Sequence, residues 1–309
     1  MRPRPRPRPR RRCFSPRRAC GARSRTPARV RLESVSSPQV RDRRSSLSAS
    51  QSRWALILGA SSGFGEAAAL EFAAAGYDIF GVHFDRRQAM PHVEEIVAGI
   101  TTLGRKAHFF NVNAADHDKR KETVAEIVRL AGGQPVQVLM HSLAFGTLKP
   151  FIADDEKEAI TPAQIEMTLD VMANSLVYWT QDLVRTGALA EGGRVFAMTS
   201  SGDHIVWKAY GAVSAAKSAL ESHVRQLAVE LSPLGISVNS IKAGVTDTPA
   251  LRKIPGNVQI VESAMARNPA GRLTTTADVA KCLVALAAPG TYWLTGSVLN
   301  VDGGEDIAG

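Results

Sequence analysis

The stretch Gly59-Ala60-Ser61-Ser62-Gly63-Phe64-Gly65 has the residue types and spacing needed to hold a phosphate group. It follows a short apolar run and leads directly into an alanine-rich segment, which predicts a strand, a tight turn and a helix. Glycines in such a turn let the backbone approach a pyrophosphate, and the helix N-terminus offers unpaired N–H groups and a favourable dipole. The stretch therefore predicts a dinucleotide site, although its Gly-x3-Gly-x-Gly spacing differs from the more common Gly-x-Gly-x-x-Gly.

The end of the second predicted strand bears on which dinucleotide is bound. An acidic residue there hydrogen-bonds the adenosine ribose, whereas basic residues accept a 2′-phosphate. The sequence reads His83-Phe84-Asp85-Arg86-Arg87. Two adjacent arginines suit a phosphate dianion, while Asp85 can serve a ribose or pair with an arginine. We therefore expect NADPH, with Arg86 and Arg87 at its phosphate, and keep NADH as the alternative.

The elements that must position these residues follow from the apolar periodicity of residues 54–309. Strands are predicted at residues 55–58, 78–84, 106–112, 136–140, 194–199, 236–241 and 297–301. Helices are predicted at residues 66–75, 90–103, 116–130, 164–186, 210–231 and 277–286. This alternation implies a parallel sheet covered on both faces, so we expect a single α/β domain with a Rossmann-type, doubly wound sheet of about seven strands. The long linker 246–276 is predicted to form a mobile flap at the ligand edge.

Charge is distributed unevenly along the 309 residues. Residues 1–53 contain 17 Arg and two acidic residues, a net charge of +15, so the remaining residues carry −6 of the total of +9. The mildly acidic core gives no electrostatic reason to bind nucleic acid. Only Cys282 of the three cysteines lies in the core, which excludes an internal disulfide there and, with no paired Cys/His spacing, predicts no metal site. No apolar run is long enough to span a bilayer, so no membrane role is expected.

Residues 1–53 form an Arg-, Pro- and Ser-rich tail that is predicted to be disordered, because it has too few apolar residues to offset the entropy of ordering. Three explanations stay open. An organelle transit peptide has this composition, although the alternating prolines forbid an amphipathic helix. A mispredicted start codon, or a basic tail that contacts nucleic acid or membrane, also fits. The predicted localisation is cytoplasmic, with a plastid or other organelle as the alternative if the tail is a transit peptide.

Further motifs occur in order along residues 54–309: the glycine stretch, Asn111-Val112 after the third strand, Val238-Asn239 in the sixth, Asp247-Thr248-Pro249 after it, and Val301-Asp302-Gly303-Gly304 near the end. With these motifs the chain resembles the short-chain dehydrogenase/reductase superfamily over essentially all of these residues. The resemblance implies an oxidoreductase that uses a nicotinamide dinucleotide.

Several positions depart from the superfamily pattern, and they do so together. Ordinary members carry Tyr-x3-Lys after the fifth strand, but here Val213 stands four residues before Lys217 and the tyrosine is seven before it, at Tyr210. The usual Asn-Asn-Ala-Gly after the fourth strand is replaced by His141-Ser142-Leu143-Ala144-Phe145-Gly146. The usual Pro-Gly after the sixth strand is replaced by Ala243-Gly244, and Met172 stands where the superfamily has its catalytic asparagine. These departures resemble the enoyl-acyl carrier protein reductases. The segment Asn268-Pro269-Ala270-Gly271-Arg272, and Ser200 where many members have a second tyrosine, resemble their bacterial NADPH-dependent branch.

Enoyl reduction gives a chemical reason for a displaced tyrosine. Hydride goes to the β-carbon of an enoyl thioester, while negative charge develops on the thioester oxygen, so the phenol must sit further along the substrate than in a ketone reductase. Tyr210, with an ordinary phenol pKa of about 10, is neutral and can donate a hydrogen bond to that oxygen. Lys217 can hold the nicotinamide ribose and favour the oxyanion. Ser200 can hydrogen-bond substrate or cap the next segment.

The resemblance also implies a cofactor site and partners. The cofactor-binding residues expected from it and from the glycine loop are Gly59, Ser61, Ser62, Gly63, Gly65, Arg86, Arg87, Asn111, Val112, Ser142, Ala144, Lys217, Gly244 and Thr246. Phe145, Trp207 and Met265 are predicted to line an acyl pocket or to pack in the core, and His141 is interpreted as a satisfied histidine in the cofactor cleft rather than an acid. The expected partner is acyl carrier protein, docking near the flap at Arg252, Lys253, Arg267 and Arg272. A homodimer or tetramer is expected through the long helices after strands four and five.

Three alternatives to an enoyl reductase remain open from sequence. The same fold and cofactor serve reduction of a dienoyl thioester or of a ketone. A non-catalytic dinucleotide-binding protein would have no use for Tyr210 as a proton donor. A nucleic-acid-binding protein would depend on the basic tail alone.

Overall fold

The computed structural model describes residues 53–308, and it contains one parallel sheet of seven strands in the order β3-β2-β1-β4-β5-β6-β7. The strands are β1 (Arg53–Leu58), β2 (Tyr77–His83), β3 (Ala107–Asn111), β4 (Val136–His141), β5 (Arg194–Ser200), β6 (Ser237–Ala243) and β7 (Val298–Val301). Every neighbouring pair is parallel. The predicted fold class and strand number are confirmed. The predictions for the tail lie outside the described residues, apart from Arg53, which opens β1.

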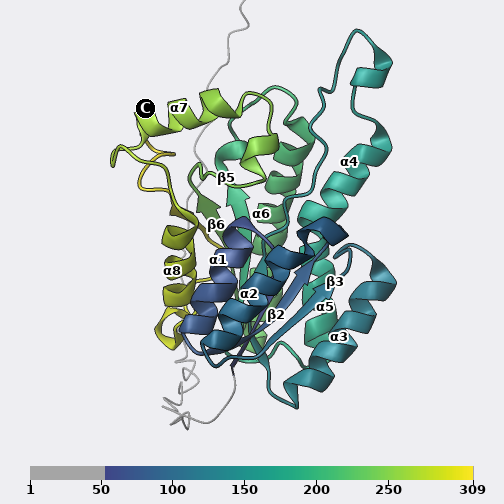
Figure 1. Cartoon of the computed structure of the whole chain (residues 1–309), viewed down its shortest axis with the longest axis vertical. Coiled ribbons are helices and arrows are strands. Elements are labelled where there is room, and N and C mark those ends of the chain that lie inside the picture. Colours follow the sequence, from purple (N-terminus) through teal and green to yellow (C-terminus); the bar gives the residue numbers. More distant parts are fainter. Residues whose placement is uncertain (1–52, 309) are drawn as a thin grey trace, which may run out of the picture. The chain divides into compact units, whose positions relative to one another are not determined.

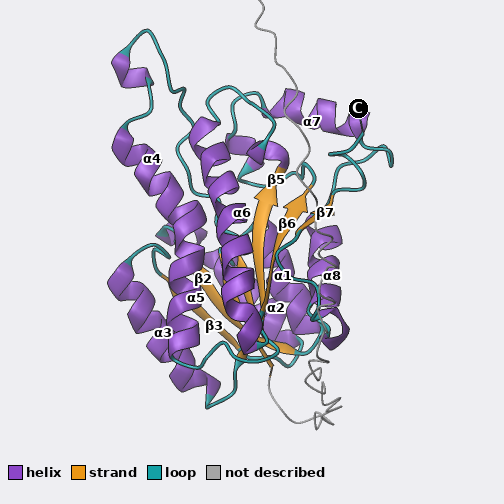
Figure 2. Ribbon diagram, turned by 180° about the vertical axis from the view of Figure 1, so that it is seen from behind, coloured by secondary structure: helices purple, strands orange, loops and turns teal. Residues whose placement is uncertain are grey.

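Helices cover both faces of this sheet (Figures 1 and 2). The α-helices are α1 (Gly63–Ala74), α2 (Met90–Thr102), α3 (His117–Ala131), α4 (Pro162–Leu169), α5 (Ser175–Arg185), α6 (Gly211–Leu231), α7 (Asn257–Arg267) and α8 (Thr276–Leu286). Helices α1, α2 and α8 lie on the face seen in Figure 1, and α3, α5 and α6 on the face seen in Figure 2. Within the described residues no helix is long and apolar enough to cross a membrane.

The central strands form because their side chains are apolar on both faces and are buried on both. All of β2 and nearly all of β1 are inaccessible to solvent. One core cluster packs β1 and β5 residues against α3, α5 and α6, and the other packs the alternate residues against α1, α2 and α8. Trp54 stacks on Phe80 with ring centroids 4.1 Å apart. Strands buried on two faces are expected in a sheet reached by helical crossovers.

The strand order reverses beside β1, and this creates the site. β1 pairs with β2 on one side and with β4 on the other. The chain leaves these neighbours toward opposite faces of the sheet, so a crevice opens at their carboxyl ends. Ligands bind at such a switch point in open α/β sheets.

Two parts of the helix prediction were wrong. The single helix expected at 164–186 is interrupted by a π-helical turn, Asp170–Asn174, between α4 and α5. The turn contains three consecutive buried residues, Val171, Met172 and Ala173. A regular helix cannot face three successive side chains toward one core, because each residue advances it by about 100°. The wider π turn accommodates them, and such turns often occur at functional sites.

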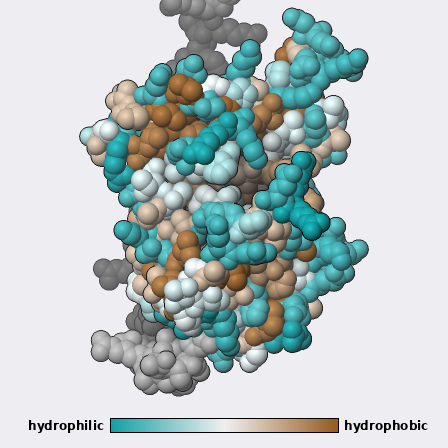
Figure 3. All heavy atoms as spheres, viewed as in Figure 1, coloured by the Kyte–Doolittle hydropathy of each residue, from teal (hydrophilic) through white to brown (hydrophobic). Residues whose placement is uncertain are grey.

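The second error concerns the linker 246–276, which contains the 3-10 turn η6 (Leu251–Lys253) and the helix α7. Helix α7 begins after Gly256, whose φ is +81°, and ends at Arg267, with Asn268 as its C-cap just before Pro269. It buries only Ile260 and Ala264 and leaves Val258 and Met265 exposed, so its periodicity was weak. In Figure 3 apolar atoms gather in the region of α7, above a hollow in this face.

Candidate active site

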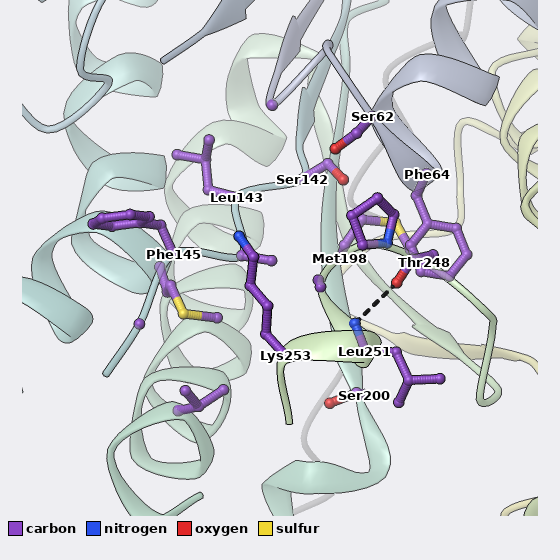
Figure 4. Close-up of a pocket in the computed structure, with 18 of the residues that line it drawn as sticks. Ser62, Phe64, Ser142, Leu143, Phe145, Met198, Ser200, Thr248, Leu251 and Lys253 are labelled. Carbon is purple, nitrogen blue, oxygen red and sulfur yellow. Dashed lines mark hydrogen bonds between the residues drawn. The ribbon is translucent and has the colours of Figure 1, made fainter. Parts of the chain in front are cut away.

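The hollow leads to a cavity of about 430 Å³ at the carboxyl ends of the strands. Its walls come from the loops that follow β1, β2, β3, β4, β5 and β6, together with α6 and η6. Figure 4 shows polar Ser62 and Ser142 on one side of it and apolar Leu143 and Phe145 on another. Twelve of the sixteen predicted site residues line the cavity: Gly59, Ser61, Ser62, Gly63, Val112, Ser142, Ala144, Ser200, Tyr210, Lys217, Gly244 and Thr246.

The glycine loop has the conformation that its sequence predicts. Gly59 adopts φ +90°, and a Cβ there would lie 2.4 Å from the Ser142 carbonyl oxygen. Gly65 lies behind the loop rather than in the cavity, and a Cβ on it would come within 2.0 Å of the Gly59 carbonyl oxygen. No side chain caps the N-terminus of α1. Its first N–H groups are therefore available to an anion, so the loop fits a dinucleotide pyrophosphate.

The end of β2 is organised around Asp85. His83 Nδ1 lies 3.0 Å from an Asp85 carboxylate oxygen, and the Asn111 side chain exchanges two hydrogen bonds with the Asp85 backbone, at 3.0 and 2.9 Å. Asp85 lines the cavity, whereas Arg86 and Arg87 are exposed just outside it and Asn111 does not line it. Asn111 therefore shapes this corner by holding the backbone of the loop.

The loop after β6 forms the opposite wall. Thr246 Oγ1 donates to the Gly244 carbonyl at 3.0 Å. Gly244 is confined by its neighbours, since a Cβ there would lie 2.3 Å from Thr274 Oγ1 and 2.9 Å from Glu305 Oε2. Thr248, two residues further on, accepts from the Leu251 N–H at 3.2 Å and so fixes the start of η6 (Figure 4).

Tyr210 immediately precedes α6 and is held against the turn η4 (Ser201–Asp203). Its ring packs so closely on Gly202 that a Cβ there would lie 2.5 Å from Tyr210 Cε1. Ala209 has φ +62°, the one positive φ at a non-glycine position in the described chain. Burial raises the pKa of Tyr210, with Ser200 acting in the opposite direction, so the phenol keeps its proton. Ser200 also accepts from the Gly202 N–H at 3.3 Å, so it caps η4 and lines the cavity.

Lys217 lies two turns along α6 from Tyr210 and reaches the same cavity. The side chain is buried, and its ammonium donates to the Met198 carbonyl of β5 at 2.7 Å. Burial lowers the pKa of Lys217 to about 8, partly offset by Glu221. At neutral pH the lysine is therefore a cation in a poorly hydrated position, where a charge acts strongly on a neighbouring anion. Val213, at the position of the usual superfamily tyrosine, also lines the cavity.

His141 is not where the sequence interpretation placed it. It is fully buried at the end of β4 and does not line the cavity. Ser175 donates to the Val171 carbonyl at 2.7 Å, so it accepts from His141 Nε2 at 2.8 Å. His141 Nδ1 has no hydrogen-bond partner among the described residues, so the histidine is only half satisfied. Burial, with the charge of Lys217, lowers the pKa of His141 to about 3, so it stays neutral.

The apolar part of the cavity was only partly predicted. Phe145 and Trp207 line it, whereas Met265 does not. Sequence reasoning missed the apolar lining residues Phe64, Leu143, Leu148, Met167, Val171, Met198, Leu251, Ile254 and Ile260, and assigned Lys253 to the protein surface alone. Several of these follow strand ends, which is the positional signal that would have identified them. The described residues hold no cluster of three or more potential metal ligands.

Together these groups form a site for proton donation and anion stabilisation beside a dinucleotide cradle. Tyr210 is a neutral O–H donor, Lys217 is a buried cation, and the glycine loop ends at open N–H groups of α1. This combination suits hydride-transfer chemistry, in which the protein contributes position and field.

Comparison with known proteins agrees with this geometry. A family model described as "Enoyl-(Acyl carrier protein) reductase" matches residues 59–305. The enoyl-[acyl-carrier-protein] reductase [NADH] of Aquifex aeolicus is 30% identical over 179 residues, covering 56% of this chain and 63% of the relative. The 3-oxoacyl-[acyl-carrier-protein] reductase of Thermotoga maritima is 24% identical, covering 81% and 96%.

A solved structure of similar fold contains a dinucleotide. The short-chain dehydrogenase from Burkholderia cenocepacia J2315 in complex with NADP has a TM-score of 0.70 and 26% identity, covering 83% of this chain and 98% of that one. The extent of the family match and the fold shared with these structures support the same family assignment. The chain belongs to the short-chain dehydrogenase/reductase superfamily of oxidoreductases, within the family whose model is described as enoyl-(acyl carrier protein) reductase.

Proposed function

We propose that this protein reduces the 2,3 double bond of enoyl thioesters with NADPH, as an enoyl-acyl carrier protein reductase. The observation that carries the proposal is the position of the only phenol in the cavity. Val213, one turn before Lys217, lines the cavity and can donate no proton, while Tyr210 enters the same cavity from the start of α6. The donor is therefore shifted away from the place used for a carbonyl carbon and toward an oxygen further along the substrate.

The residues of the chain divide the work as follows. Tyr210 donates a hydrogen bond to the thioester oxygen, and its raised pKa keeps the phenol protonated. Lys217 places a positive charge beside that oxygen in a site of low polarity. Phe145 and Trp207 exclude water from the acyl chain. The dinucleotide, when bound, supplies the hydride.

Arg86 and Arg87 support the choice of NADPH. Both are exposed next to the corner of the cavity formed by Asp85. Asp85 is already held by His83, which leaves its carboxylate less free to accept from a ribose. Replacing both arginines with alanine is expected to raise the Kd for NADPH by roughly tenfold to a hundredfold and to leave the Kd for NADH nearly unchanged. Fluorescence titration with the two dinucleotides measures this, and an equal effect on both would contradict the assignment.

The acyl carrier is proposed to approach past η6, because this is where cationic side chains and the cavity meet. Three of the four predicted docking residues are occupied in ion pairs: Arg252 with Asp247, Arg272 with Asp278, and Arg267 with Glu305. Lys253 makes no ion pair with a described residue, and Figure 4 shows its side chain extending across the cavity toward Leu143. An acidic carrier or the phosphate of its prosthetic arm suits this lysine.

Assembly into a dimer or tetramer remains part of the proposal, through the faces of α5 and α6 that point away from the sheet. Val229 on α6 is 72% exposed and is a surface that a second copy would cover. Light scattering of the purified protein measures the mass directly. A monomer at micromolar concentration would contradict this part.

The decisive experiment compares substrates. Purified protein is mixed with NADPH and either crotonyl thioester, a 3-oxoacyl thioester or a dienoyl thioester, and loss of NADPH absorbance is followed. The proposal expects turnover of the crotonyl thioester to exceed that of the other two by at least roughly a hundredfold in kcat/KM. Turnover of the 3-oxoacyl thioester alone would identify a ketone reductase instead. Turnover of none, with NADPH still bound, would favour a non-catalytic protein.

A further inference from the structure

A cluster of charged side chains lies behind Tyr210 and joins three segments that are distant in sequence. His204, just after η4, has Nδ1 2.6 Å from an Asp203 carboxylate oxygen and Nε2 3.1 Å from Asp306 Oδ1. Lys242 of β6 donates to both Asp203 oxygens at 3.1 and 3.2 Å and lies 3.9 Å from Asp306. Asp306 belongs to the C-terminal segment 302–308, whose residues were not part of the predicted site.

One end of this cluster belongs to the turn on which Tyr210 packs. Asp203 ends η4, and Gly202 of the same turn packs against the Tyr210 ring. The Asp203 carbonyl also accepts from Ser218 of α6 at 3.3 Å. The Tyr210 ring therefore lies between α6, which it precedes, and a turn whose far side is fastened by His204.

The other end reaches the opposite wall of the cavity. Glu305, next to Asp306, accepts from the Val245 N–H of the loop after β6 at 3.1 Å. The Asp302 carbonyl accepts from Asn268 Nδ2 at 2.8 Å, which ties the segment to the end of α7. Val245 lines the cavity. The C-terminal segment thus contacts both the loop that carries the proton donor and the loop that faces it.

The number of hydrogen bonds that His204 can donate depends on whether its imidazole is protonated. Asp306 Oδ1 is buried and accepts no hydrogen bond of good geometry from the described residues, and His204 Nε2 lies 3.1 Å from it. A protonated imidazole can donate to Asp203 and Asp306 together, whereas a neutral one can donate to only one of them. Burial opposes ionisation of Asp203, but hydrogen bonds from His204 and Lys242 hold its pKa below the ordinary value. The Asp203 carboxylate is therefore available as an acceptor at neutral pH.

We propose that His204 and Asp306 form a clamp, closed when His204 is protonated, by which the C-terminal segment holds η4 against Tyr210 and so positions the proton donor. His204 and Asp306 are positioning residues, because neither lines the cavity. The catalytic half of this inference rests on the role proposed for Tyr210. The structural half, that the clamp restrains η4, does not.

Hydrogen exchange tests the structural half without any substrate. The His204 and Ile205 N–H groups donate to the Ser201 carbonyl at 3.1 and 2.8 Å, so their protection reports whether η4 is held. His204→Gln and Asp306→Asn are each expected to lower the protection factors in residues 201–210 by roughly threefold to tenfold. The double variant should be no worse than the stronger single variant. His117→Gln removes a matched exposed pair with Asp118 on α3, 2.9 Å apart, and should change nothing. Unchanged protection in both clamp variants would overturn the proposal.

The pH dependence of turnover tests the catalytic half. In the wild-type protein kcat should rise as pH falls from about 7.5 to about 5.5, a range that lies below the pKa of about 8 of Lys217 and in which histidines usually gain their proton. His204→Gln should have the lower value throughout, and His204→Arg, which is charged at every pH and can donate to both carboxylates, should restore the higher value and lose the pH dependence. The KM for dinucleotide should not follow these changes. Altered protection with unchanged kcat would overturn the positioning role, whereas a wild-type protein that reduces no enoyl thioester would count against the proposed function and leave the exchange result standing.

Discussion

The two sides of the cavity are built by different means. On the dinucleotide side, main-chain atoms pack directly on one another: Gly65 against the Gly59 carbonyl, and Gly59 against the Ser142 carbonyl. On the substrate side, the loops after β5 and β6 are held by side-chain charges, by Lys242 and His204 with Asp203, and by Glu305 with Val245. The first side depends on the absence of side chains, and the second on the charges that side chains carry.

Because of this difference, the two sides should tolerate different changes in pH, salt and side-chain size. Main-chain packing has no titratable groups, so the fold of the glycine loop should be insensitive to pH and salt but intolerant of any added carbon atom. Charge pairs that are partly exposed are weakened by salt and pH but adjust to small changes in shape. Four substitutions test the comparison, from the largest expected effect to the smallest.

Tyr210→Phe should damage the substrate side alone. Loss of the phenol hydroxyl is expected to lower kcat by roughly a hundredfold to a thousandfold, because one donor to a developing oxyanion contributes that much. The Kd for NADPH should stay within about twofold of wild type. Steady-state turnover and dinucleotide titration measure the two effects. Tyr292→Phe, on an exposed tyrosine before β7, is the matched control. Equal kcat in Tyr210→Phe and wild type would show that the phenol is not the donor.

Gly65→Ala should damage the dinucleotide side alone. The new Cβ would lie 2.0 Å from the Gly59 carbonyl oxygen, so the loop or the helix has to move. We expect a loss of about 1–3 kcal/mol in the free energy of unfolding, as for other overpacked sites, and weaker NADPH binding. Chemical denaturation and titration measure both. Gly290→Ala, with no atom within 4 Å of the added Cβ, is the control. Equal stability of the two variants would mean that the contact is easily relieved.

Lys217 lies at the boundary between the two sides, and Lys217→Met should have opposite effects on stability and on activity. Burial lowers the pKa of Lys217 to about 8, from an ordinary lysine pKa of 10.5. The unfolded chain therefore binds the proton more tightly, and the lysine lowers stability below about pH 8 by an amount that declines as pH rises toward 10.5. The variant should be inactive yet roughly 1–2 kcal/mol more stable at pH 7, with the difference from wild type shrinking above pH 8. Destabilisation at pH 7 instead would show that the bond to Met198 outweighs the burial of charge.

Lys253→Gln should have the smallest effect, and only on the carrier. The KM for acyl carrier protein substrate is expected to rise roughly threefold at low salt and to match wild type at high salt, since an exposed charge is screened. Arg252→Gln, on the same turn but already paired with Asp247, is the control. A salt-independent rise would mean that Lys253 contacts the substrate within the cavity instead.

The contrast between the two sides also explains which features could be predicted from sequence. The parallel sheet of seven strands and the glycine loop depend on apolar periodicity and on short motifs, and the structure contains both. Tyr210 and Lys217, singled out by their spacing, line the same cavity. A position that requires glycine can be recognised from sequence, because it belongs to a short turn motif.

The features that were missed depend on tertiary partners. Asp306 and His204 are about a hundred residues apart, and only the fold brings them to 3.1 Å. The π turn at Asp170–Asn174 preserves ordinary helical composition, so no local pattern distinguishes it from α-helix. The tie between His83 and Asp85 changes what Asp85 can do without changing its place in the motif. In each case the sequence provides the residues, and the pairing appears only in three dimensions.

Ala209 links the stability of the domain to the stiffness of the approach to Tyr210. Its left-handed backbone conformation, φ +62°, costs roughly 1–2 kcal/mol for any residue with a Cβ, a cost that glycine would avoid. The alanine methyl also restricts the alternative conformations open to the residue that precedes Tyr210. Glycine at position 209 would therefore relieve the backbone strain and loosen the approach to Tyr210, so stability and stiffness make opposite demands on this one residue.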